Sequence, residues 1–390
     1  MHTTQKLIIG DCRESLKNIP NDSIDCVVTS PPYWGLRDYK TDPVIWGGSD
    51  DCVHEWNDST KIKSVGCGKT AIVGNQLNGA SDVIINQSIC SKCNAWKGQL
   101  GLEPDPNLYI KHLCDIFDQV KRVLKPSGTC WVNLGDSYST GGGSTNKDFN
   151  ERYSGGASGQ RKQENEKPKM NIDMPDKCLV QIPSRFALEM TSRGWILRNE
   201  IIWHKPNCMP SSVTDRFTVD FEKVFFFVKS KRYYFKQQYE KFECNDLNSP
   251  SYRKNGKSDS RTKHVGIEGV TPVFSDNGFW KPEGAGRNKR TVWTIPTRPY
   301  SGSHFAVFPI DLIAPMIDAG CPPNGTVMDI FSGSGTVLEY CRDHDLNGIG
   351  LELNPEYEKL AADRAMLNVP NILQYAEDGT TENDIQSDGE

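Results

Sequence analysis

Residues 326 to 353 constrain the fold of this chain most, because they alternate strand, loop, helix and strand in a short space. A β-rich run at Thr326–Ile330 enters a loop with two glycines, Val337–Asp343 has helical character, and Asn347–Leu353 is a second apolar run. Strand, crossover helix and parallel strand form the unit from which doubly wound α/β sheets are built. Ligands of such sheets bind beyond the carboxyl ends of the strands, so we expect the glycine loop at a ligand site.

The same alternation recurs through the rest of the chain. Apolar residues at helical spacing occupy Asn107–Leu124, and the turn residues Pro126–Gly128 separate them from a strand-like run at Thr129–Leu134. The other predicted elements are strands at Ile24–Thr29, Trp195–Trp203 and Val224–Val228 and helices at Pro183–Ser192 and Pro355–Leu367. This order predicts an α/β fold with a Rossmann-like, doubly wound, mostly parallel sheet.

The bulk composition narrows the class of protein further. The chain has 390 residues, of which 36% are hydrophobic, enough for one large core or two modest ones. Its start lacks the basic and apolar regions of a signal peptide, and no apolar run reaches the roughly 18 residues of a membrane span. We therefore expect a cytoplasmic protein that does not enter membranes.

Charge is distributed unevenly along the sequence. The net charge of −5 gives no global attraction to nucleic acid. Between Lys229 and Lys263, however, ten Lys or Arg residues stand against four Asp or Glu residues, with tyrosines among them. Such a stretch is either a solvated surface or a contact for nucleic acid.

A short loop, Ser30-Pro31-Pro32-Tyr33, follows the strand predicted at Ile24–Thr29. The two prolines fix the backbone and donate no hydrogen bonds, which leaves the Ser30 hydroxyl and the Pro31 carbonyl as acceptors beside an aromatic ring. Two acceptors can grip the exocyclic amine of a flipped base and turn its lone pair towards an electrophile, while Tyr33 stacks on the base. Taken alone, the tetrapeptide could equally be a stiff turn with a core aromatic residue.

The glycine loop after Thr326–Ile330 has a second feature, the acid Glu352 at the tip of the next strand. Glycines let a backbone approach a ligand closely, and an acid in that position can accept hydrogen bonds from both hydroxyls of a ribose. The third glycine of a dinucleotide fingerprint and the lysine of a Walker loop are missing. The pattern predicts a nucleoside site that is neither a nicotinamide nor an ATP site, with a plain tight turn as the alternative.

Together the two motifs resemble those of the amino-group DNA methyltransferases, which modify cytosine N4 or adenine N6, in the permuted arrangement where the tetrapeptide precedes the cofactor half. The resemblance covers most of residues 5–370. It implies S-adenosylmethionine as methyl donor, the four residues from Ser30 to Tyr33 as catalytic residues, base flipping, and direct attack of the amine on the methyl group. The cofactor-binding residues that it implies are Asp11, His304, Phe305, Phe308, Pro309, Asp329, Phe331, Gly333, Gly335, Thr336 and Glu352.

The first residue of the tetrapeptide bears on the choice of base. Serine is usual there among the cytosine N4 enzymes, whereas adenine N6 enzymes mostly carry Asp or Asn. Ser30 therefore favours a site-specific cytosine N4 DNA methyltransferase, with adenine N6 as the alternative. A similar loop could also methylate RNA or a protein amide, and a silent zinc-bearing DNA-binding module would use the basic stretch alone.

A polar insert after the tetrapeptide carries candidate metal ligands. The residues Cys52, His54, Cys90 and Cys93 supply the four N and S ligands that a structural zinc prefers. The second cysteine pair has the spacing of a zinc knuckle, the first pair is tighter than common finger spacing, and Cys67 could substitute for one ligand. Buried or free thiols are the alternative. Four closed ligands leave no open position, so we expect zinc to support folding rather than catalysis.

These features predict the organisation of the whole chain. We expect a catalytic half at 1–48, a zinc-binding insert at 49–100, a core segment at 101–140, a target-recognition region at 141–290 interleaved with core strands near 180–235, a cofactor-binding half at 291–372 and a disordered acidic tail at 373–390. The polar middle would neutralise phosphates and read base edges of double-stranded DNA. The resemblance also implies a monomer or homodimer and allows a cognate restriction endonuclease as a partner.

Overall fold

A computed structural model describes residues 3–36, 39, 41–60, 86–139, 174–175, 177–240, 273–274, 280–281, 287–297 and 308–367. The strands of its main sheet are β1 (Gln5–Ile9), β2 (Ile24–Thr29), β7 (Leu124–Leu134), β8 (Ile196–His204), β9 (Phe221–Val228), β14 (Val292–Thr294), β15 (Thr326–Asp329) and β16 (Asn347–Glu352). The helices are α1 (Cys12–Lys17), α2 (Pro106–Val123), α4 (Ile182–Ser192), α5 (Ile310–Gly320), α6 (Thr336–Asp343) and α7 (Glu358–Ala365), with a 3₁₀ turn, η3 (Pro355–Tyr357), before α7.

The main sheet has the strand order β1-β16-β15-β2-β7-β9-β8-β14. Strand β9 runs antiparallel to both of its neighbours, and the other described pairs of this sheet are parallel. Two short antiparallel ladders pair β10 (Tyr239–Glu240) with β13 (Arg287–Asn288), and β11 (Val273–Phe274) with β12 (Trp280–Lys281). The expected mostly parallel α/β sheet is confirmed.

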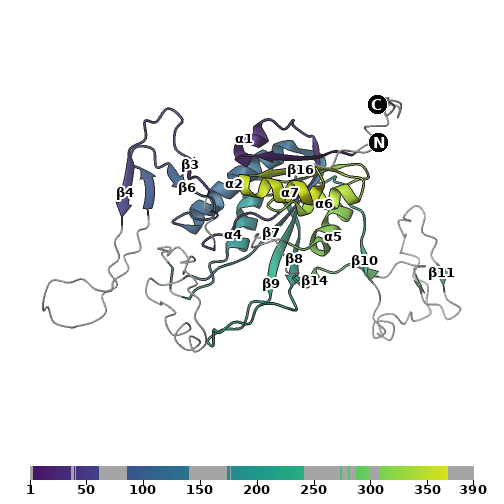
Figure 1. The fold of residues 1–390 in the computed structure, drawn as a ribbon. Helices are drawn as coiled ribbons and strands as arrows, with labels where there is room; N and C mark the ends of the chain where they lie inside the picture. Colours follow the sequence, from purple (N-terminus) through teal and green to yellow (C-terminus); the bar gives the residue numbers. More distant parts are fainter. Residues whose placement is uncertain are drawn as a thin grey trace, which may run out of the picture.

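Helices cover both faces of this sheet, as the alternation of side chains along β7 and β9 shows. Cys130 and Phe225 belong to the core formed with α1, α2 and α4, whereas Trp131 and Phe226 belong to the core formed with α5 and α6. Trp131 and Phe226 stack with their ring centroids 4.0 Å apart. The result is a three-layer α/β/α arrangement (Figure 1).

A second sheet interrupts the chain between β2 and α2. Its antiparallel strands are β3 (Val44–Trp46), β4 (Trp56–Thr60), β5 (Asn86–Cys90) and β6 (Trp96–Gly98), in the order β3-β6-β5-β4. Figure 1 shows β3 and β6 beside α2. Trp46 and Trp96 stack on the buried His112 of α2, with ring centroids 4.9 and 5.7 Å away. The insert is therefore packed onto the main core.

Most predicted elements appear within a few residues of their expected ends, and two predictions were wrong in detail. Helix α2 ends at Val123, and the expected turn at Pro126–Gly128 lies inside β7. A register shift between Ile24 and Cys26 of the partner strand β2 accompanies this proline, which lacks a donor for the ladder. The helix expected at Pro355–Leu367 begins with a 3₁₀ turn instead. Strand β1 and helices α1 and α5 were not predicted.

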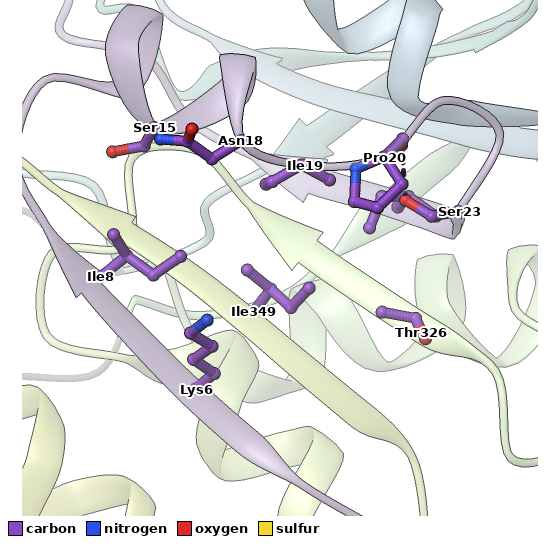
Figure 2. Close-up of a pocket in the computed structure, with 10 residues that line it drawn as sticks. Lys6, Ile8, Ser15, Asn18, Ile19, Pro20, Ser23, Thr326 and Ile349 are labelled. Atoms are coloured by element: carbon purple, nitrogen blue, oxygen red, sulfur yellow. Dashed lines mark hydrogen bonds between the residues drawn. The ribbon is translucent and has the colours of Figure 1, made fainter.

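Several expectations fall outside the described residues. They include the stretch Gly141–Lys169, most of residues 245–290, the tail 373–390 and Cys67. None of the helices in the described part of the chain is long and apolar enough to span a membrane. A cavity of about 280 Å³ lies below α1 (Figure 2), where Lys6, Ser23 and Thr326 mark the amino ends of their strands. It contains none of the predicted site residues.

Candidate active site

The two loops singled out by the sequence leave neighbouring strands at the same edge of the sheet. Strand β2 ends at Thr29 and its parallel neighbour β15 ends at Asp329. The Thr29 hydroxyl donates a buried hydrogen bond of 2.7 Å to Oδ1 of Asp329. The tetrapeptide that begins at Ser30 and the glycine loop therefore start side by side.

A third strand brings Asp11 to this edge. Ile9 of β1 pairs with Glu352 of β16, and the Gly10 amide donates to the Glu352 carbonyl at 2.7 Å. Gly10 has φ +142°, a conformation that glycine adopts far more readily than other residues. Asp11 then caps α1 and pairs with Arg13 at 2.6 Å. Asp11 and Glu352 therefore lie at the carboxyl ends of two neighbouring parallel strands, β1 and β16.

The glycine loop is fixed largely by its own backbone and by Glu352. The two carboxylate oxygens of Glu352 accept from the amides of Gly333 at 2.7 Å and Asn354 at 2.8 Å. Gly335 has φ +79°, and a Cβ there would lie 3.1 Å from Ala361 of α7. Burial raises the pKa of Glu352 above its usual value. The loop therefore has little room for any residue other than glycine at this turn.

Asp329 is fully buried at the base of this loop. Burial, together with the charge of Glu352, raises its pKa to about 7, although hydrogen bonds from Thr29 and the Phe331 amide act in the other direction. Its Oδ2 atom and the hydroxyl of Ser332 are buried without a hydrogen-bond partner among the described residues. Buried polar atoms usually have a partner, so these two are consistent with a polar ligand beside the loop.

The remaining residues implied for the cofactor differ in their surroundings. Thr336 is buried, and its hydroxyl accepts from Arg364 at 2.9 Å, so it ties α6 to α7. Phe308 is half-buried, and Pro309 precedes the first turn of α5. Because α5 leads into the start of β15, its own start lies near the carboxyl edge of the sheet. His304 and Phe305 lie outside the described residues.

The tetrapeptide is held by side chains from distant elements. Pro31 is buried, while Ser30 and Pro32 are half-buried. The Tyr109 hydroxyl of α2 donates to the Pro32 carbonyl at 2.7 Å. This bond engages the carbonyl of the second proline. Among the described residues, the Pro31 carbonyl has no hydrogen-bond donor.

The residues after the tetrapeptide attach it to the insert. The indole nitrogen of Trp34 donates to the Glu103 carbonyl at 2.9 Å, and the Gly35 amide donates to the Gly101 carbonyl at 2.8 Å. Glu103 is buried and lies 3.1 Å from Nδ1 of His112, the ring on which the tryptophans of β3 and β6 stack. The small sheet and the tetrapeptide thus share one buried support.

Tyr33 has the most polar surroundings in the loop. Its hydroxyl lies 2.7 Å from Oε2 of Glu222 and 3.0 Å from Oδ1 of Asn133, and the Ser30 hydroxyl lies 3.4 Å away. A Cβ on Gly135 would come within 2.5 Å of the Tyr33 ring, so the ring packs directly on that glycine. Burial and then the charge of Glu222 raise the pKa of Tyr33 well above its usual value, which keeps the phenol neutral.

The four candidate metal ligands converge in the small sheet. The ligand atoms of Cys52, His54, Cys90 and Cys93 all lie within 4.8 Å of one another. Cys52 Sγ is 3.9 Å from Cys90 Sγ, and Cys93 Sγ is 3.3 Å from His54 Nδ1. A tetrahedral zinc with ordinary bond lengths needs about 3.8 Å between two sulfurs and about 3.6 Å between sulfur and nitrogen. These two distances are close to those of a tetrahedral zinc site.

Sequence reasoning missed the residues that hold the tetrapeptide. The sequence patterns did not single out Tyr109, Asn133 or Glu222, which pairs with Lys205. Tyr109 sits on the apolar face of a predicted helix and Asn133 interrupts an apolar strand, which are weak signals. Glu222 precedes the strand predicted at Val224–Val228 and gave no signal at all.

Comparison with known proteins shows where these features belong. The sequence model of the family described as DNA methylase, covering N6 and N4 enzymes, matches residues 24–363. The type II methyltransferase M.SmaI of Serratia marcescens is 35% identical over 361 residues, spanning 93% of this chain and 90% of the relative. The type II methyltransferase M.Cfr9I of Citrobacter freundii is 32% identical over 374 residues, spanning 95% and 90%.

Among solved structures, the cytosine-N4-specific PvuII DNA methyltransferase is similar in fold. Its TM-score is 0.50 at 16% sequence identity, over 97% of this chain and 92% of that chain. This likeness supports the methyltransferase fold that the sheet order indicates. The match to the family sequence model over most of the chain, with relatives above 30% identity, shows that the chain belongs to the N6/N4 DNA methylase family.

Proposed function

We propose that this protein transfers a methyl group from S-adenosylmethionine to the exocyclic N4 amine of a cytosine flipped out of double-stranded DNA. The observation that carries the proposal is the hydrogen bond between Thr29 and Asp329. It joins the ends of the two strands from which the tetrapeptide and the glycine loop begin. A loop suited to hold an amine and a loop suited to hold a nucleoside therefore lie next to each other. Family membership agrees with this reaction.

The chain's own residues would prepare the amine for attack. Ser30 and the Pro31 carbonyl would accept its two N–H groups, because the Pro32 carbonyl is engaged by Tyr109. Tyr33 would stack on the base and fix its plane. With the amine held in this way, its lone pair would point out of the ring plane, and the nitrogen would release one proton to solvent as it accepts the methyl group, so no covalent enzyme intermediate is needed.

The glycine loop would hold S-adenosylmethionine, which supplies an electrophilic methyl group. Glu352 and the backbone around Gly333 would receive its ribose, with Asp11 beside the adenine. The unpartnered polar atoms of Asp329 and Ser332 support a polar ligand at this place. His304, Phe305, Phe308 and Pro309 are proposed to touch the methionine end, and Phe331 belongs to the glycine loop.

Cytosine rather than adenine is proposed because Ser30 occupies the first position of the tetrapeptide. A hydroxyl accepts fewer hydrogen bonds than a carboxylate and carries no charge. Ser30 would therefore hold the amine less strongly than an acidic residue would. Serine at this position is usual among the cytosine N4 enzymes that the sequence resembles. Adenine N6 is the second candidate.

The proposal is tested by incubating the protein with unmodified duplex DNA and methyl-labelled cofactor. We expect label in the DNA of the wild-type reaction. With Ser30→Ala, the label in DNA should fall to background. The control is Ser23→Ala, which removes a hydroxyl bonded to the Pro20 carbonyl at the opposite end of β2 and should leave transfer intact. A wild-type reaction that leaves no label in DNA would contradict the proposal.

We also propose that Cys52, His54, Cys90 and Cys93 hold a structural zinc ion. Their mutual distances fit a tetrahedral site, and four protein ligands leave no position for substrate. Metal analysis of purified protein should find one zinc per chain, and Cys93→Ser should lose it. A preparation that folds and methylates with no bound metal would overturn this assignment.

In the proposed organisation, residues 141–290 recognise DNA and lie between the catalytic half and the cofactor-binding half of the sequence. The described part of this region contributes β8 and β9 to the main sheet, and the rest would contact the duplex. Relatives named as type II methyltransferases suggest a cognate restriction endonuclease as partner. A monomer or homodimer is the proposed assembly.

A further inference from the structure

A half-buried charge network lies at the hydroxyl of Tyr33. Glu222 is the second residue of β9 and Lys205 follows β8, so the antiparallel pairing of these strands brings the two side chains together. The Lys205 ammonium binds Oε1 of Glu222, while Oε2 lies 2.7 Å from the Tyr33 hydroxyl. Both charged side chains are only 18% exposed. Each oxygen of the carboxylate thus has its own partner.

The lysine end of this network is also fixed. Lys205 Nζ lies 4.3 Å from the ring centre of Trp203, an attractive position for a cation. Trp203 is buried and donates its indole proton to the Ile295 carbonyl at 2.8 Å. The chain of contacts from Trp203 through Lys205 and Glu222 therefore reaches the phenol from a rigid part of the sheet.

We propose that Glu222, held by Lys205, is a positioning residue that fixes the place of the Tyr33 ring for stacking on the target base. The inference rests on the proposed function and adds residues to it. Asn133 alone would not give the same restraint, because a tyrosine hydroxyl has one proton to donate and a carboxylate is the stronger acceptor. Gly135 supports one part of the ring, and Glu222 fixes its tip.

The test compares Glu222→Met, which removes both acceptors at similar side-chain length, with Glu222→Gln, which keeps an acceptor for the phenol. Misplacing a reacting group can cost up to about a hundredfold, so we expect Glu222→Met to lower the single-turnover methylation rate roughly tenfold or more. Cofactor affinity should stay within about twofold, because the glycine loop is untouched. Glu222→Gln keeps one acceptor oxygen, which can face either the phenol or Lys205, so its rate should fall between those of Glu222→Met and the wild type.

A matched control lies on the same two strands. Glu200 of β8 pairs with Lys223 of β9 at 2.7 Å and contacts no residue of the tetrapeptide in the described structure. Glu200→Met should therefore remove an ion pair without slowing methylation. If Glu222→Met is no slower than Glu200→Met, the inference is wrong.

A double-variant cycle separates positioning from general destabilisation. If Glu222 acts through the phenol, Tyr33→Phe combined with Glu222→Met should be no slower than the slower single variant, whereas independent effects would multiply. Should Glu222→Met fail to fold, Lys205→Met offers a milder release of the same carboxylate, with an expected loss of about threefold. A fully multiplicative cycle would contradict the inference.

Failure of the inference and failure of the proposed function give different results. A wild-type protein that methylates no base in DNA refutes the proposed function. In that case the same Tyr33 and Glu222 cycle, measured by thermal unfolding, still reports whether the carboxylate holds the phenol. An active wild type with an unaffected Glu222→Met variant refutes the inference alone.

Discussion

The two loops that carry the proposed chemistry leave neighbouring strands, yet they are held in different ways. The glycine loop after β15 is fixed from nearby, by Glu352 on the next strand and by the left-handed turn at Gly335. The tetrapeptide after β2 is fixed by side chains from remote parts of the chain, namely Tyr109 and Glu222. The residues that shape the glycine loop can be recognised in a local sequence, whereas the remote side chains that hold the tetrapeptide cannot.

This difference predicts that substitutions around the two loops will affect different measured quantities. Changes around the glycine loop should alter cofactor affinity and stability. Changes around the tetrapeptide should alter the transfer rate and leave cofactor affinity unchanged. Single substitutions that change both cofactor affinity and transfer rate would argue against this distinction between the loops.

Tyr33→Ala should give the largest difference between the effect on transfer rate and the effect on cofactor affinity. Loss of the ring should lower the single-turnover rate by about a hundredfold to a thousandfold, the range found when one preorganised group of an active site is removed. Cofactor affinity, measured by calorimetry on the same preparation, should stay near that of the wild type. An equal loss of both quantities would mean that the two loops do not act separately.

Asp329 offers a test that depends on pH. Burial raises its pKa to about 7 in the folded protein, so the folded chain keeps a proton that the unfolded chain releases from about pH 4 upwards. The free energy of unfolding should therefore fall as pH rises from about 4 to 7, by at most about 1.4 kcal/mol per pH unit, and level off above 7.

Asp329→Asn keeps an acceptor for the Thr29 hydroxyl and cannot ionise. Denaturant unfolding of both proteins at a series of pH values should show a steeper fall in the wild type than in the variant, which keeps only the contribution of other buried carboxyls such as Glu352. Parallel curves for the two proteins would show that Asp329 ionises normally and that its burial has little effect.

Gly335→Ala should mainly affect the glycine loop. The left-handed conformation costs a residue with a Cβ about 1–2 kcal/mol, and here the new atom also meets Ala361. We expect lower thermal stability and a cofactor affinity reduced by about tenfold, with little change in the rate at saturating cofactor. Gly47→Ala is the control, because Gly47 has φ +66° but no atom within 4 Å of a new Cβ. It should lose stability and keep its cofactor affinity.

The smallest predicted effect is that of Tyr109→Phe. Removing the hydrogen bond to the Pro32 carbonyl should cost about 1 kcal/mol, or about fivefold in the transfer rate. Tyr340→Phe removes a hydrogen bond of 2.7 Å to Asp318, which lies away from both loops. Stopped-flow or quench-flow rates should fall for Tyr109→Phe only. Equal rates for the two variants would show that Tyr109 does not position the tetrapeptide.

Much of the fold could be predicted because its strands are strongly apolar and its loops carry glycine or proline. The run Ile24–Thr29 became β2 with unchanged ends, and Asn347–Leu353 became β16 within one residue. Helix α5 was missed because Pro315 lies inside it and most of its residues are apolar, which hides the helical period. Strand β1 is a short edge strand whose partner, β16, lies at the other end of the sequence.

The candidate site could be predicted only where its residues act locally. Gly333, Gly335 and Glu352 belong to one strand–helix–strand unit, so their relation is visible in the sequence. Tyr33 and Glu222 are separated by 189 positions, and only the strand order β2-β7-β9 brings them together. The cysteine pairs were recognisable from spacing within each pair, although their approach depends on the pairing of β4 with β5.

The central claim is that this chain methylates cytosine N4 in duplex DNA, and the most direct measurement identifies the modified base. Duplex DNA treated with the protein and methyl-labelled S-adenosylmethionine is digested to nucleosides and analysed by mass spectrometry. The account predicts label in N4-methylcytosine. Label in N6-methyladenine alone would contradict the role assigned to Ser30, and label in neither base would contradict the proposed function itself.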